Sequence, residues 1–236
     1  MVHSETNEEV WYVQMTQIGK EINLLARYPK TNRNLTERLQ RKSEHVRTIA
    51  KQFGFEYFDG NREYGYGGFN YDPRFWTDVV QDFVEHYKLT SESEVLDVGC
   101  AKGFFLYDLQ KAVPGIRITG VDISTYAIEH SLEEVKPHLL IGDSRSLPFP
   151  DKAFDLVISI NTIHNLDREG CGESLREIER VSRKDSFIMV DAYRNDEEKE
   201  RMYAWNLTAL TIMSDKEWKD FFKEVGYSGD FFWFIP

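Results

Sequence analysis

After residue 90 the chain alternates short apolar, β-branched runs with segments of helical pattern, and this alternation most constrains its fold. The runs are EVLDVGC, RITGVDIS, HLLIG, FDLVISIN and SFIMVDAY. Runs that are apolar almost throughout are typical of parallel strands covered on both faces. The pattern predicts an α/β fold, a doubly wound, mostly parallel sheet with helices on both faces. The final FFWFIP is expected to form a last strand, paired antiparallel with a segment near Gly226.

Helical patterns dominate before residue 90. Apolar residues recur at three-, four- and seven-residue spacings between roughly 35 and 53, which predicts one helix closed by Gly54. A second helix should begin near Pro73, because proline favours the first helical turn. We therefore divide the chain into an N-terminal helical cap with a lid, residues 1–88, and a core, residues 89–236.

Residues 62–76, REYGYGGFNYDPRFW, combine six aromatic rings with four glycine or proline residues. Neighbouring glycines oppose helix and strand, whereas six rings are more apolar surface than a solvated loop usually carries. We interpret the stretch as a lid over the carboxyl ends of the strands, with Tyr64 and Tyr66 bordering a bound ligand. An aromatic plug that packs the N-terminal helices onto the core is the alternative.

Charge is distributed unevenly along the chain. The formal net charge of −11 disfavours nucleic-acid binding, which rests on clustered Lys and Arg. Residues 27–51 nevertheless hold eight Lys or Arg and two Glu, a local net charge of +6. This segment is either the solvated face of a basic helix or a site for an anionic substrate.

Cys100 and Cys171 are the only cysteines, too few for a disulfide framework and too isolated for a zinc site. No metal is therefore expected. The first residues, MVHSETNEEV, lack the pattern of an export signal, and no apolar run approaches the ~20 residues needed to span a bilayer. These features predict a cytoplasmic protein without a membrane anchor and leave monomer and homodimer both open.

Small and acidic residues follow the first three apolar runs, where an open parallel sheet binds its ligands. DVGCAKG supplies a tight turn before a helix, whose free amides can meet a carboxylate or phosphate. Asp122 follows the second run, twenty-five residues beyond Asp97, where an acid can accept both ribose hydroxyls. Asp143, after the third, could accept from an adenine amine. Each Asp alone could be a helix N-cap; three in order predict an adenosine site.

Two ligand classes fit such a site, a dinucleotide and S-adenosylmethionine. The dinucleotide fingerprint would put its third glycine at position 104, where Phe104 would crowd the pyrophosphate. DVGCAKG instead resembles motif I of the class I S-adenosylmethionine-dependent methyltransferases, with Ala101 replacing the middle glycine. GVDIS, GDSRSLPFPDKAFDLVIS and INTIHNL resemble that family's following motifs, over roughly residues 92 to 191.

The resemblance implies a seven-stranded sheet and S-adenosylmethionine as donor, with S-adenosylhomocysteine as product. It also implies the donor-binding residues. Ala101 is expected to keep the turn tight at negative φ, and an exposed side chain is expected for Lys102. The implied set is Asp97, Gly99, Ala101 and Gly103 for the methionine part, Asp122 at the ribose, Asp143 with Ser144 at the adenine, Asn161 close to the donor, and Ile123 as a further donor-binding residue.

Candidates for meeting the methyl acceptor follow the fourth and fifth runs. His164 could take a proton from a hydroxyl, because an unperturbed His titrates near neutrality; the alternative is a His that only hydrogen-bonds locally. Tyr193 and Arg194 follow the fifth run, and Arg194 could hold a phosphate or carboxylate. The charged stretch RNDEEKER makes an exposed surface pairing of Arg194 an equal alternative.

The sequence thus predicts a methyltransferase acting on a small, anionic acceptor, with oxygen favoured over nitrogen. RYPKTNRN and YGYGGFNYDPRFW resemble methyltransferases of bacterial surface-polysaccharide and sugar modification, which favours a sugar, a nucleotide-linked sugar or a phosphorylated metabolite. Two alternatives remain open: an NAD-dependent oxidoreductase, and a non-catalytic S-adenosylmethionine-binding protein.

Overall fold

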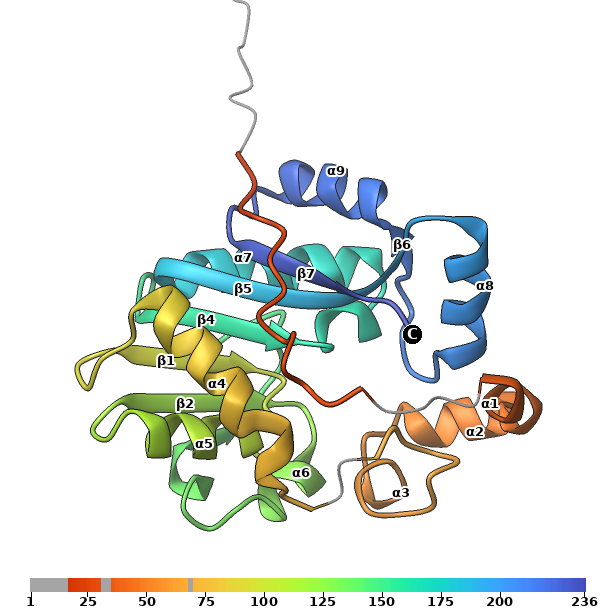
Figure 1. Cartoon of the computed structure of the whole chain (residues 1–236), viewed down its shortest axis with the longest axis horizontal. Helices are drawn as coiled ribbons and strands as arrows, with labels where there is room; N and C mark the ends of the chain where they lie inside the picture. Colours follow the sequence, from red (N-terminus) through yellow and green to blue (C-terminus); the bar gives the residue numbers. More distant parts are fainter. Residues whose placement is uncertain (1–16, 31–34, 68–69) are drawn as a thin grey trace, which may run out of the picture.

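The computed structural model describes residues 17–30, 35–67 and 70–236, and its centre is a seven-stranded sheet (Figure 1). Five strands lie in the order β3-β2-β1-β4-β5, and both β6 and β7 pair with β5. Every strand pair is parallel, which confirms the predicted doubly wound sheet. The strands are β1 Glu94–Val98, β2 Arg117–Asp122, β3 Leu139–Ile141, β4 Phe154–Ile160, β5 Ser182–Tyr193, β6 Met213–Ser214 and β7 Asp230–Phe234.

Helices cover both faces of the sheet, as the apolar strands require. One face packs against α4 (Pro73–Tyr87) and α5 (Phe104–Ala112), and the other against α7 (Arg168–Val181) and α9 (Asp215–Val225) (Figure 1). Successive strand residues point to opposite faces of the sheet and so belong to two different hydrophobic cores. Val95 packs with side chains of α4 and α5, and Leu96 packs with those of α7 and α9. Short helices α6 (Thr125–Glu129), η1 (Lys136–His138) and η2 (Ile163–Asn165) lie in the connections.

The last strand corrects the antiparallel pairing that we expected, because β7 runs parallel to β5. Its connection from β6 is helix α9, which starts at a Ser214–Glu217 capping box and ends at Gly226 with φ of 80°. A helical crossover returns the chain in the same direction, whereas an antiparallel partner needs only a tight turn. On the outer edge of β7, Ile22 donates its amide to the Phe231 carbonyl and Phe231 donates to that of Lys20. Residues 20–22 thereby cover this edge.

The N-terminal region forms three short helices rather than one continuous helix near 35–53. They are α1 (Leu35–Arg41), α2 (Glu44–Ala50) and α3 (Phe55–Phe58). Ser43 interrupts the first two, since its hydroxyl caps α2 by accepting from the Val46 amide. The three helices lie beyond the carboxyl ends of the strands, where α1 packs against α8 (Asp196–Trp205) (Figure 1).

Basic side chains of the 27–51 segment fasten this cap to α8. Arg38 Nε donates to the Trp205 carbonyl at 3.4 Å, and Lys42 donates to the carbonyl of Tyr203. These carbonyls belong to the last turn of α8, where the helix dipole favours positive charge. Arg47 Nε continues the contact by donating to the Leu207 carbonyl at 3.1 Å. For these three residues the structure supports a role in holding the cap.

Candidate functional site

A cleft of about 1140 Å³ opens between the carboxyl ends of the strands and the N-terminal cap. Most of the residues predicted to bind donor or acceptor line it. Those that do are Tyr66, Asp97, Gly99, Ala101, Asp122, Ile123, Asp143, Ser144, Asn161 and His164. The strand ends therefore bring the predicted adenosine-site residues together.

The turn after β1 has a left-handed backbone at three positions. The φ angles are 87° at Gly99, 49° at Ala101 and 75° at Gly103. The expectation of negative φ at Ala101 is therefore wrong: the tight turn needs left-handed geometry there despite the methyl group. Gly99 is doubly constrained, because a Cβ at this position would lie 2.1 Å from Thr162 Oγ1. Gly103 ends the turn as the N-cap of α5 and does not line the cleft.

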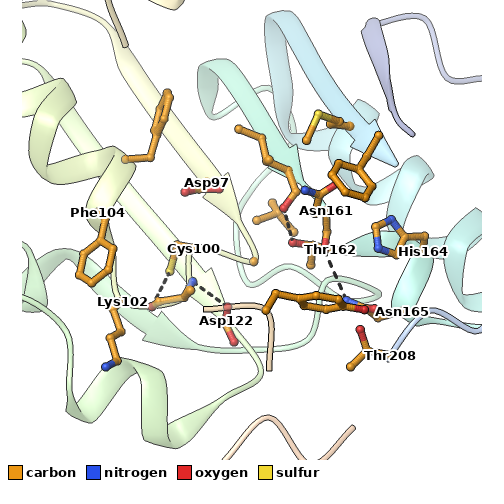
Figure 2. A pocket seen from close by; sticks show the side chains of 18 of the residues that line it. Asp97, Cys100, Lys102, Phe104, Asp122, Asn161, Thr162, His164, Asn165 and Thr208 are labelled. Carbon is orange, nitrogen blue, oxygen red and sulfur yellow. Dashed lines mark hydrogen bonds between the residues drawn. The ribbon is translucent and has the colours of Figure 1, made fainter. Parts of the chain in front are cut away.

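Two carboxylates, those of the buried Asp97 and the half-buried Asp122, face the cleft beside this turn (Figure 2). Burial, with the neighbouring Asp122 charge, raises the pKa of Asp97 to about 8. Burial also raises the pKa of Asp122, although its carboxylate accepts from the amides of Ala101 and Ser124, each at 2.8 Å. Neither acid forms an ion pair with a described residue. The pair suits a cationic ligand, and S-adenosylmethionine carries both a sulfonium and an ammonium group.

Lys102 is buried, contrary to the exposed side chain that we expected. Its ammonium contacts both oxygens of Asp59, at 2.5 and 2.7 Å, and Tyr126 donates to the same carboxylate at 2.7 Å. Figure 2 shows the Lys102 side chain directed away from Asp122. Asp59 directly follows α3, so this ion pair fastens the cap to the turn after β1.

The predicted adenine side of the cleft carries Asp143 and Ser144, and Ile123 lines the same cleft. Arg145 binds the Asp143 carboxylate through Nε and Nη2 and holds the pKa of that acid below its usual range. The Ser144 hydroxyl shares a hydrogen bond of 2.8 Å with that of Ser174. Ile123 is 58% exposed at the cleft wall, an apolar surface on which a flat ring can pack.

His164 is 4% exposed, and its hydrogen bonds define its tautomer. Its Nδ1 accepts from the Asp191 backbone amide at 3.0 Å, so the neutral ring carries its proton on Nε2. That nitrogen lies 3.6 Å from Asp191 Oδ1. Burial lowers the pKa of His164 to about 3. The ring has no free basic nitrogen toward the cleft, which favours local hydrogen bonding over proton abstraction.

Asp191, which our sequence reasoning missed, lines the cleft from β5. It is 5% exposed, and its carboxylate accepts no hydrogen bond from any described residue. Burial raises its pKa to about 7. A signal was present in the sequence: an acid within the apolar run SFIMVDAY is exceptional, because Asp is almost never fully buried without a partner.

The remaining candidates lie away from the cleft lining. Arg194 Nη2 forms an ion pair of 3.1 Å with Glu21, and the Tyr193 hydroxyl lies 3.5 Å from Glu217. Tyr64 packs against the cluster of Val46, Ala50 and Leu207. Tyr66 does line the cleft, and its hydroxyl accepts from the Leu207 amide at 2.7 Å. Of the lid stretch, Gly68 and Phe69 lie outside the described residues.

The described part of the chain contains neither a metal-binding cluster nor a membrane-spanning helix. No group of three or more His, Cys, Asp or Glu side chains there could hold a metal ion. No helix in residues 17–30, 35–67 or 70–236 is long and apolar enough to cross a membrane.

Comparison with known proteins agrees with this geometry over the sheet. Residues 96–190 match the model of the methyltransferase domain family. Malonyl-[acyl-carrier protein] O-methyltransferase of Legionella pneumophila is 31% identical over 124 residues, which are 51% of this chain and 43% of that protein. Arginine-hydroxylase NDUFAF5 of Rattus norvegicus is 34% identical over 88 residues, 37% of this chain and 24% of that one. The chain thus spans less than half the length of either relative.

Among solved structures, that of the MccD protein superposes with a TM-score of 0.51 at 23% identity, covering 66% of this chain and 72% of that one. This likeness concerns the fold alone. The family match runs from within β1 to within β5 and includes the turn after β1, Asp97 and Asp122. Residues 96–190 are thus similar to the methyltransferase domain family in sequence.

Proposed function

We propose that the chain transfers a methyl group from S-adenosylmethionine to a small anionic acceptor. The observation that carries this proposal is the separation of charge across the cleft. Its sheet side presents the acids Asp97 and Asp122. Its cap side presents Lys30, Lys51 and Arg62, which form no ion pair with a described residue. A cationic donor fits the first side and an anionic acceptor the second.

The donor supplies a methyl group already activated on sulfur, so the protein mainly has to hold it, align the acceptor and exclude water. Asp122 would accept the ribose hydroxyls with the lone pairs that the Ala101 and Ser124 amides leave free. Asp97 and the turn after β1 would hold the methionine part. Asn161, at φ of 56°, follows β4 directly and would lie beside the donor.

An anionic acceptor would give the basic segment a second role beside its contacts with α8. Lys30 and Lys51 belong to this segment, and Arg62 begins the lid stretch. A nucleotide-linked sugar or a phosphorylated metabolite offers a phosphate for these cations and a hydroxyl for methylation. The name of the Legionella pneumophila relative, an O-methyltransferase, supports oxygen as the acceptor atom.

Calorimetry tests the donor first. S-adenosylhomocysteine should bind the wild-type protein while NAD does not, and Asp122→Ala should weaken the binding at least tenfold. Binding of NAD instead of S-adenosylhomocysteine would favour the oxidoreductase alternative. Unchanged affinity in Asp122→Ala would move the ribose site elsewhere.

Transfer of labelled methyl to a panel of nucleotide sugars, phosphorylated metabolites and uncharged analogues tests the acceptor. With the substrate found, Lys51→Gln and Arg62→Gln should raise KM for the charged acceptor and leave donor affinity unchanged. Arg41→Gln is the matched control, because Arg41 pairs with Glu37 outside this cleft. A preference for uncharged analogues contradicts the anionic acceptor, and donor binding without transfer favours a non-catalytic binding protein.

A further inference from the structure

Hydrogen-bond acceptors without donors gather at one end of the cleft. Figure 2 shows His164, Asn165 and Thr208 together on the side away from Lys102 and Phe104. Asn165 Oδ1 is buried and has no hydrogen-bond partner, while its Nδ2 donates to the Asn161 carbonyl at 3.5 Å. That contact fixes the orientation of the amide, because the opposite one would place two oxygens against each other. An unpaired buried acceptor costs about 1–3 kcal/mol.

The Asp191 carboxylate is a second acceptor at this end of the cleft. It is buried, lines the same cleft and accepts no hydrogen bond from the described residues. His164 Nε2 lies 3.6 Å from Asp191 Oδ1, just beyond hydrogen-bonding distance. A cleft end that offers two unsatisfied acceptors is complementary to a ligand that brings donors.

We propose that Asp191 and Asn165 bind the reacting end of the methyl acceptor and that Asp191 takes the proton which the reacting atom releases. This end of the acceptor carries at least two hydrogen-bond donors, such as neighbouring sugar hydroxyls or an amine. This inference rests on the proposed function and deepens it. It divides the acceptor into an anionic part, held by the cap cations, and a donor-rich part, held beneath them at the strand ends.

Methyl transfer to such a group releases one proton from the acceptor. An oxygen or nitrogen lone pair of the acceptor forms the new bond to the methyl carbon, and the carbon–sulfur bond breaks with its electrons left on sulfur. The proton released from that oxygen or nitrogen passes to the Asp191 carboxylate. The gain from such a positioned base is typically about 10²–10⁴-fold in rate.

The surroundings of Asp191 suit this role. Burial raises its pKa to about 7, close to the pH at which a base works best. The other titratable groups that face it are His164 and the phenols of Tyr57 and Tyr66. Burial raises the pKa values of the two phenols. His164 is a positioning residue: its Nδ1 holds the Asp191 backbone, and its Nε2 proton points toward the carboxylate.

Two measurements test the inference. NMR of the protein without acceptor should show His164 as the Nε2–H tautomer, with no protonation between pH 5 and 8, while the Asp191 carboxyl titrates near neutrality. In the methyl-transfer assay, Asp191→Asn should lower kcat at least a hundredfold and leave S-adenosylhomocysteine affinity within about threefold. Asn165→Leu should raise acceptor KM without lowering thermal stability, since it removes an unsatisfied group.

Protonation of His164 within this range, an Asp191 titration near pH 4, or an active Asp191→Asn variant would each overturn Asp191 as the proton acceptor. An Asn165→Leu variant with unchanged KM would remove Asn165 from the acceptor site. Failure of the wild-type protein to methylate any panel member counts against the proposed function alone, because the NMR titration is read without an acceptor. Failure of the proposed function and failure of Asp191 as the proton acceptor can therefore be told apart.

Discussion

The turn after β1 permits a quantitative test through Gly99→Ala. The substitution places a Cβ on a residue whose φ is 87°, which costs about 1–2 kcal/mol. The same Cβ would lie 2.1 Å from Thr162 Oγ1 and 2.6 Å from its Cβ, an overlap worth about 1–3 kcal/mol once neighbours shift. Reduced freedom of the unfolded chain returns roughly 0.4–1 kcal/mol.

The net loss is therefore about 1–4.6 kcal/mol, or roughly 2–18 °C in Tm for a chain of this length. Thermal unfolding followed by circular dichroism measures it. Gly54→Ala is the control, because that glycine has φ of −98° and no heavy atom within 4 Å of a built Cβ. It should stay within ~0.5 kcal/mol of wild type.

Thr162→Ala in the Gly99→Ala background separates the two costs. Removing Oγ1 and Cγ2 should recover part of the loss from overlap, whereas the cost of positive φ remains. A Gly99→Ala protein that melts with wild type would refute the reasoning, since both backbone strain and overlap would then be absent. No recovery in the double variant would assign the entire loss to φ.

Three further predictions concern the site and its cap. Because the pKa of Asp97 is raised to about 8, donor binding to its ionised form should strengthen as pH rises from 6 to 8, and Asp97→Asn should abolish this dependence in calorimetry. Lys102→Met should lower the free energy of unfolding by about 1–3 kcal/mol and speed amide exchange near Asp59. The loss stays modest because Asp59 is only partly buried and keeps its hydrogen bond from Tyr126. Unchanged amide exchange would contradict the role of this ion pair in fastening the cap. Arg47→Met should lower the free energy of unfolding in urea by about 1–2 kcal/mol, because it removes the hydrogen bond to the Leu207 carbonyl. An unchanged free energy of unfolding would contradict the role of Arg47 in holding the cap.

Local chemistry explains which parts of the fold the sequence could predict. Apolar runs mark buried parallel strands because both faces must exclude water, and the turn residues at their ends follow from topology. The direction of β7 was also readable, through the Ser214–Glu217 capping box and Gly226 that define α9 as a crossover.

Side-chain environments were harder to predict, because they depend on contacts between distant segments. Lys102 is buried only because Asp59, 43 residues earlier, reaches it. His164 loses its free nitrogen to the amide of Asp191, 27 residues later. Neither partner is marked by spacing or composition, so the same residues read in isolation suggest an exposed lysine and an available base.

The contacts around Asp122 have a consequence for how the two substrates bind. Its carboxylate is held by the Ser124 amide, and the Ser124 hydroxyl in turn donates to the carbonyl of Phe53, a cap residue at φ of 48°. A donor that binds Asp122 and restricts its motion should therefore also restrict the motion of Phe53, which lines the cleft on the side of the cap where the acceptor would bind. By thermodynamic reciprocity the acceptor must then raise donor affinity by the same factor. We expect synergistic binding, with each substrate retained longer in the presence of the other.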